Sequence, residues 1–331
     1  MKYLLEPLNI GKLALKNRLV LPPMATSKSK EDGSVSKEIL DYYYEKSQGG
    51  YLGLVIIEHS YITQQGKASE GQLSVTNESC FEGLCKLADI IHKNGSKAVM
   101  QINHAGSATN QSVTGLDVVG PSRIKNPRIG SIPKELTQKE IKNIIEDFKK
   151  AAILVKEAGF DAVEIHSAHG YLLNQFFSPL TNKRNDKYGK DVLGRIRIHL
   201  EIIAAIRKAL GEDFPLLLRL GAADYMEGGS TIEDSKIAAV EFAKAGIDIL
   251  DISGGFCGYV LKNNNEQGYF SPLTKALKEV VSIPVILTGG ITEVTVAEKL
   301  LADKKADLIG VGRAILKDSD WAKKAIKTLN N

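Results

Sequence analysis

The sequence has few cysteines and no segment typical of a membrane protein. Its three cysteines, Cys80, Cys85 and Cys257, form no C-x-x-C pair, so neither a disulfide framework nor a zinc or iron–sulfur site is indicated. Such sparse cysteine use fits a reducing cytoplasm. No apolar run approaches the ~20 residues that a membrane helix needs, and residues 1–7 lack the pattern of a secretory leader. We therefore expect an unprocessed, soluble, cytoplasmic protein.

The sequence also lacks blocks of like charge. Its 43 basic and 39 acidic residues give a net charge of +4 and are spread along the whole chain. Proteins that bind nucleic acid usually carry basic clusters. No Gly-x-Gly-x-x-Gly follows a predicted strand, which argues against a tightly held dinucleotide. We expect a small-molecule substrate and neither nucleic acid nor a membrane as partner.

Short apolar runs alternate with longer amphipathic stretches along the 331 residues. This alternation is typical of βα units that build a parallel sheet. The segments Ala158–Asp161 and Ala245–Asp248 repeat one unit, in which glycine ends a helix just before a strand, and this favours a closed barrel. An open doubly wound sheet is the alternative. The predicted strands are Arg18–Leu21, Gly53–Glu58, Ala98–Ile102, Ala162–Ile165, Leu216–Leu220, Ile249–Ile252, Val285–Leu287 and Leu308–Val311.

Helix signals fill the gaps between these strands. Thr137 and Glu140 form a capping-box pattern before the amphipathic stretch Ile141–Ala158, and Gly159 is placed to end that helix. Further helices are predicted at Leu193–Leu210, Thr231–Ala245, Thr274–Val280, Thr292–Leu301 and Trp321–Leu329.

Two segments lie outside the repeating units. Leu8–Lys16 carries Gly11-Lys12 between apolar residues, so we expect a hairpin that packs on the N-terminal end of the barrel. The connection His104–Leu136 is longer than most loops, and we expect it to overhang the active site. The predicted fold is an α/β (β/α)8 TIM barrel, a single domain over residues 1–331, with an N-terminal hairpin and a long loop after the third strand.

Polar residues that follow the strands are the candidates for chemistry, because barrel active sites lie at the C-terminal strand ends. His166, His169 and Tyr171 follow the fourth strand. Two imidazole N–H groups can bind one carbonyl oxygen and stabilise enolate charge, and a phenol can donate a proton. Three alternatives stay open: a metal site with Glu164 as third ligand, two structural histidines, and a tyrosine that only packs.

Glycine turns follow the seventh and eighth strands, at Gly289-Gly290 and at Gly312-Arg313. Barrels commonly hold a phosphate there, through backbone N–H groups near a short helix, which we expect at Arg313–Leu316. Arg313 adds a fixed positive charge. The sequence therefore predicts a ligand that carries a phosphate.

Taken together, these residues resemble the old yellow enzyme family of FMN-dependent ene reductases, and in particular its bacterial branch with two histidines. The resemblance spans nearly the whole chain. Its most specific pieces are Lys16-Asn17-Arg18 leading to Pro23-Met24, Gln101 with His104-Ala105-Gly106, Gly159-Phe160-Asp161 leading to His166 through Leu172, Phe177 to Asn182 with Arg184 and Tyr188-Gly189, and Ala306-Asp307 leading to Gly312-Arg313.

The resemblance implies an NAD(P)H-dependent flavin oxidoreductase. Bound FMN would receive hydride from NADH or NADPH and reduce activated C=C bonds, nitro compounds or quinones by a ping-pong scheme. His166 and His169 would bind the substrate carbonyl or the nicotinamide, and Tyr171 would donate the proton. The implied FMN-binding residues are Pro22, Pro23, Met24, Ala25, His59, Gln101, Arg219, Gly289, Gly290, Gly312 and Arg313.

Three positions depart from the family pattern. Ala25 replaces a cysteine or threonine that tunes the flavin in other members, so that such tuning is absent or comes from Thr26. His59 stands where relatives usually have a small residue. Ser107 stands where arginine or lysine is common. The chain ends at Asn331 without the C-terminal arginine that some bacterial members insert into a neighbouring subunit, so homo-oligomerisation stays open.

Two other functions remain possible on the sequence alone. A non-redox barrel lyase or isomerase would use the glycine turns for a sugar phosphate and would need a catalytic carboxylate or lysine, for which Glu58 is the candidate. A flavin-binding protein without turnover is suggested by Ala25 and His59. Oxidation of NADH or NADPH in the presence of a cyclic enone separates these from an ene reductase.

Overall fold

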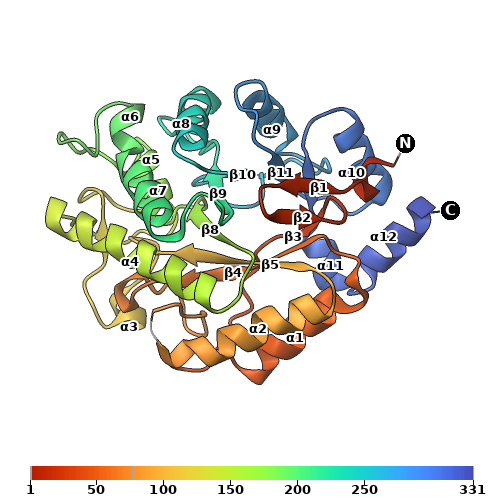
Figure 1. Cartoon of the computed structure of the whole chain (residues 1–331). Coiled ribbons are helices and arrows are strands. Elements are labelled where there is room, and N and C mark those ends of the chain that lie inside the picture. Colours follow the sequence, from red (N-terminus) through yellow and green to blue (C-terminus); the bar gives the residue numbers. More distant parts are fainter. Residues whose placement is uncertain (1, 77, 331) are drawn as a thin grey trace.

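Eight parallel strands close into a barrel in the computed structural model, which describes residues 2–76 and 78–330 (Figure 1). Met1 and Asn331, the ends of the predicted domain, lie outside the described residues. The predicted barrel is confirmed, and the open sheet is wrong. The strands are β3 Leu19–Leu21, β4 Leu54–Tyr61, β5 Lys97–Asn103, β8 Ala162–Ser167, β9 Leu216–Gly221, β10 Ile249–Ser253, β11 Val285–Thr288 and β12 Leu308–Gly310.

The register of β4 on β5 contains the irregularity that matters most for the site. Ile57 pairs with Met100, but Ser60 pairs with Ile102, so β4 carries one extra residue between these pairs. This β-bulge contains Glu58 and His59. Bulges re-aim side chains at the rims of barrels, and here the strand continues to Tyr61, three residues beyond its predicted end.

The N-terminal hairpin closes one end of the barrel. β1 Leu8–Ile10 pairs antiparallel with β2 Leu13–Leu15, and Gly11 adopts a φ of +55° in the turn. Ile10, Leu13 and Leu15 pack against inward-facing apolar residues at the strand beginnings, such as Leu54 and Ala162. The predicted position of the hairpin is confirmed.

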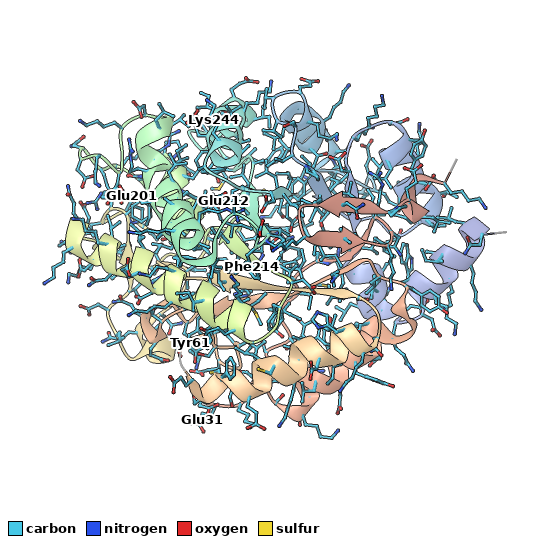
Figure 2. The ribbon with its side chains drawn as sticks, in the orientation of Figure 1. Glu31, Tyr61, Glu201, Glu212, Phe214 and Lys244 are labelled. Atoms are coloured by element: carbon cyan, nitrogen blue, oxygen red, sulfur yellow. The ribbon has the colours of Figure 1, made fainter. Side chains whose placement is uncertain are left out.

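Helices surround the barrel and carry charged side chains, among them Glu201 and Lys244 (Figure 2). The longer helices are α1 Lys37–Ser47, α2 Phe81–Lys93, α4 Gln138–Glu157, α7 Arg197–Leu210, α8 Ile232–Lys244, α9 Ser271–Lys278, α10 Val294–Ala302 and α12 Trp321–Asn330. Short helices are α3 Gln111–Thr114, α5 Leu172–Phe177, α6 Val192–Arg195 and α11 Arg313–Lys317, with 3-10 turns at Tyr3–Leu5, Gln48–Gly50, Gln64–Gly66 and Glu78–Cys80. Over the described part of the chain, no helix has the length and apolarity to cross a membrane.

Most predicted helices are confirmed, and the capping box of Thr137 and Glu140 is present at the start of α4. The predicted helix Leu193–Leu210 is instead two helices, α6 and α7, separated at Ile196 (φ −91°, ψ 0°). Helices α1 and α2 were not predicted. Ser36 offered a signal for α1, since its side chain accepts a hydrogen bond from Ile39 N and caps the helix.

The long loop His104–Leu136 is partly regular. It contains α3 and two short strands, β6 Val119–Gly120 and β7 Lys134–Glu135, which pair with each other. Arg128 from this loop lines the cavity at the C-terminal end of the barrel. The expectation that the loop overhangs this end is therefore confirmed.

The hairpin plug makes a prediction about stability. Leu13 is 1% exposed and packs inside the barrel. We expect Leu13→Ala to lower the free energy of unfolding by about 2–5 kcal/mol, because it removes apolar contacts and leaves a cavity. Urea unfolding followed by circular dichroism measures this change. Lys12→Ala is the control, since the Lys12 side chain is 70% exposed. Equal stability of the two variants would contradict the packing of the hairpin inside the barrel end.

Candidate active site

A cavity of about 460 Å³ opens at the C-terminal ends of the barrel strands. Thirteen of the fourteen predicted site residues line it: Pro22, Pro23, Met24, Ala25, His59, Gln101, His166, His169, Tyr171, Arg219, Gly290, Gly312 and Arg313. Gly289 does not line it; the Gly289 carbonyl accepts a hydrogen bond from Gly268 N at 2.6 Å. The other lining residues are Arg128, Tyr259, Tyr269, Thr288, Ile291, Thr292, Gly310 and Leu316.

Several of these additional residues come from loops that the sequence analysis did not assign to the site. Arg128 lies in the long loop after β5, and its Nη1 donates to the His169 carbonyl. Tyr259 and Tyr269 lie between β10 and α9. Their only signal in the sequence is the length of that segment, because neither tyrosine directly follows a strand.

His166 and His169 lie at the end of β8 and in the turn that follows it. Their ring centroids are 5.1 Å apart. His169 has a φ of +60°, which is unusual for a residue other than glycine, and its Nε2 lies 2.7 Å from Ser253 Oγ. Both rings are buried, and burial lowers the pKa of each far below its usual value; His169 adds to this effect at His166, and Arg219 at His169. Both histidines are therefore neutral at physiological pH.

Tyr171 precedes α5 and faces the same space. Its ring centroid lies 5.1 Å from that of His166 and 5.0 Å from that of His59. Burial raises the pKa of the Tyr171 phenol, and the positive charge of Arg128 opposes this shift. Tyr171 therefore carries its proton at neutral pH.

A buried charged cluster lies among the inward-facing residues of neighbouring strands. Arg219 Nε is 3.2 Å from Asp251 Oδ2, and Gln101 Nε2 donates to Glu164 Oε1 at 2.7 Å. Burial raises the pKa of Asp251 to about 6, against the pull of Arg219. Burial, together with the charge of Asp251, raises the pKa of Glu164 well above its usual value. Glu164 is thus held neutral, and Arg219 is partnered by Asp251.

The cavity fits a phosphate-bearing cofactor such as the expected FMN. Its lining residues include three arginines and no carboxylate. A Cβ on Gly310 would lie 2.0 Å from Thr288 Oγ1, and one on Gly312 would lie 3.1 Å from Met24 Sδ, so a side chain at either glycine would collide with or press on residues that line the cavity. Thr288 Oγ1 and His166 Nδ1 are buried without a hydrogen-bond partner among the described residues. These two polar atoms are therefore available for hydrogen bonds to a ligand in the cavity.

Glu58, the carboxylate required by a lyase or isomerase, is engaged elsewhere. Thr26 N and Thr26 Oγ1 each donate to Glu58 at 2.7 Å, and neither residue lines the cavity. The Thr26 hydroxyl thus faces Glu58, which argues against Thr26 as a substitute for the family's flavin-tuning residue. Within residues 2–76 and 78–330, no three histidine, cysteine or acidic side chains are grouped as a metal site.

Comparisons with known proteins agree on one family. Residues 3–331 match the NADH:flavin oxidoreductase / NADH oxidase family. An NADH oxidase of Thermoanaerobacter brockii is 43% identical over 96% of this chain and 49% of its own length. An NADPH dehydrogenase of Clostridium acetobutylicum is 37% identical over 95% of this chain and 91% of its own. The chain thus spans about half of the first relative and most of the second.

A solved structure of an old yellow enzyme homologue from Zymomonas mobilis superposes with a TM-score of 0.87. It is 25% identical to this chain, and the match covers 98% of this chain and 92% of the other. The two proteins therefore share the barrel along essentially their whole lengths.

The environment of Glu58 predicts a pH-dependent stability. Burial raises its pKa from 4.5 to about 7, opposed by the hydrogen bonds from Thr26. Because this folded-state pKa lies above that of the unfolded chain, the folded state binds the proton more tightly between the two values. The contribution of Glu58 to stability is therefore full at low pH and falls as the pH rises through this window, by at most about 1.4 kcal/mol per pH unit.

Glu58→Gln keeps a hydrogen-bond partner for Thr26 N and for Thr26 Oγ1, but the amide does not titrate. We expect the free energy of unfolding of the wild type, minus that of Glu58→Gln, to decrease from about pH 5 to about pH 7. Urea unfolding at each pH measures this difference. Glu227→Gln, at an exposed position, is the control, and a difference that does not vary with pH would contradict the buried, titrating Glu58.

Proposed function

The chain belongs to the NADH:flavin oxidoreductase / NADH oxidase family, and from this membership we propose that it is an FMN-dependent enzyme that reduces activated C=C bonds with NADH or NADPH. The resemblance to the old yellow enzyme family is confirmed. The observation that carries the proposal is the meeting of His166, His169 and Tyr171 on one wall of a cavity that fits the flavin. We treat residues 1–331 as one FMN-binding domain acting in the cytoplasm.

The proposed residues that hold FMN fall into two groups. Gln101 and Arg219 would face the flavin ring together with Pro22, Pro23, Met24 and Ala25, while Gly290, Gly312 and Arg313 would hold the phosphate. Bound FMN would supply hydride transfer between the nicotinamide and the alkene, and ping-pong kinetics would follow. The fixed charge of Arg219 would favour the negative charge that reduced flavin carries.

The two histidines would bind the carbonyl oxygen of the acceptor. Because both are neutral, each ring has one N–H to donate. Ser253 engages Nε2 of His169, so a ligand oxygen can be bound through Nδ1 of that ring. Donors fixed in this way stabilise the negative charge that grows on the oxygen as the conjugated carbon is attacked. Nitro groups and quinones present oxygens of the same kind.

Tyr171 would supply the proton. Its phenol is buried beside the histidines and stays protonated, which suits a group that gives a proton to carbon at the end of the reaction. The relatives are named for NADH in one case and NADPH in the other, and we propose that either nicotinamide can be the donor.

The purified protein is expected to be yellow, with FMN that is released on denaturation. It should oxidise NADH or NADPH when a cyclic enone such as cyclohexenone is added. Absorbance at the flavin band and steady-state nicotinamide oxidation measure both properties. A protein that stays colourless after FMN is added would refute the flavin site, and FMN binding without enone-dependent turnover would instead support a flavin-binding protein.

Tyr171→Phe tests the proton donor. We expect flavin reduction by the nicotinamide to be preserved and the reduction of cyclohexenone to slow by about 100-fold or more, since only the second step needs a proton. Stopped-flow absorbance separates the two half-reactions. Equal loss in both would show that Tyr171 has another role.

A further inference from the structure

His59 reaches the cavity because of the bulge in β4. Leu54 and Ile56 face the barrel interior, and regular alternation would therefore place Glu58 inward and His59 outward. The extra residue between Ile57 and Ser60 changes this order. His59 lines the cavity, and its Nε2 lies 3.4 Å from the Tyr171 hydroxyl.

The partners of Gln72 determine which nitrogen of His59 carries the proton. Ala68 N donates to Gln72 Oε1 at 2.7 Å, which fixes the orientation of the Gln72 amide. Gln72 Nε2 therefore faces His59, at 3.0 Å from its carbonyl oxygen and 2.8 Å from its Nδ1. Because an amide N–H can only donate, His59 Nδ1 is the acceptor. Burial and the nearby Arg219 lower the pKa of His59 to about 4, so the ring is neutral with its single proton on Nε2.

The direction of the contact with Tyr171 follows from this tautomer. His59 Nε2–H donates, and the Tyr171 oxygen accepts. The phenolic proton must then point elsewhere, and Tyr171 faces the cavity. Such contacts are often long in the absence of ligands and shorten in the reacting complex.

We propose that His59 is a positioning residue that donates a hydrogen bond from Nε2 to Tyr171, leaves the Tyr171 proton free for the substrate and stabilises the phenolate that forms. The inference rests on the proposed function. In the proposed reduction one carbon of the alkene would receive a hydride equivalent, which is the chemistry that bound FMN would supply. The Tyr171 O–H bond breaks, its proton forms the new bond to the other carbon, and its electron pair stays on the phenolate oxygen until water returns a proton.

A double-mutant cycle tests the dependence on Tyr171. We expect His59→Leu to slow cyclohexenone reduction about 10- to 100-fold, the effect of losing one hydrogen bond to a charged oxygen. The rate of cyclohexenone reduction should fall much further than the rate of flavin reduction by the nicotinamide, because only the second half-reaction needs the Tyr171 proton. In a Tyr171→Phe background, His59→Leu should have no further effect, because no phenolate forms. An equal effect in both backgrounds would overturn the proposal.

His59→Gln is the matched variant, since its amide can accept from Gln72 and donate to Tyr171. We expect it to recover most of the lost rate. Failure of Gln to recover more than Leu does, with both variants retaining FMN, would contradict the hydrogen bond. FMN content and circular dichroism show whether each variant folds.

The tautomer is measurable without turnover. The holoenzyme is labelled with ¹⁵N-histidine, and NMR records the two ring nitrogens of each histidine. Near pH 7 we expect the two signals that are missing from His59→Gln to come from a protonated Nε2 and an unprotonated Nδ1. The opposite tautomer would overturn the proposal. An enzyme with the expected tautomer that reduces no enone would contradict the proposed function while supporting the hydrogen bond, so the two failures are distinguishable.

Discussion

The buried ion pair of Arg219 and Asp251 is the interaction on which the cavity depends. Removing two charges from water costs several kcal/mol per ion, and here the attraction between Arg219 Nε and Asp251 Oδ2, 3.2 Å apart without hydrogen-bond geometry, offsets part of that cost. Glu164 lies close enough for the charge of Asp251 to help raise its pKa and keep it neutral. Below this layer the hairpin fills the barrel with apolar side chains. Arg219 is therefore a fixed positive charge at the cavity.

Burial sets the protonation state of the three cavity histidines, and the charge of Arg219 adds to its effect. Burial lowers the pKa of His59, His166 and His169, and Arg219 lowers all three further. Each ring is thus neutral and can donate one hydrogen bond and accept one. The Gln72 amide selects the tautomer of His59, because its N–H can only donate to Nδ1, whereas the Ser253 hydroxyl occupies Nε2 of His169 as either donor or acceptor. The three neutral rings therefore add no cationic charge to the cavity beyond that of its arginines.

The barrel was predictable because strands covered on both sides need apolar runs, and each run is local in sequence. His166, His169 and Tyr171 were predictable for a similar reason, since they follow one strand within six residues. Arg128 and Tyr259 were not, because long loops return to the cavity along paths that no local pattern encodes. The separation of α6 from α7 at Ile196 was also missed, since the apolar periodicity continues across it.

The sequence by itself determined the strand order along the chain, the apolar layers of the barrel, the histidine and tyrosine cluster and the glycine turns. The tertiary structure alone decided how the His59 side chain reaches the cavity and which neighbours it contacts. Regular alternation with Leu54 and Ile56 would place the His59 side chain outside the barrel. The pairing of β4 with β5 contains a bulge at this point, and the bulge directs His59 into the cavity. Register between strands is a property of two segments together, so neither segment contains it alone.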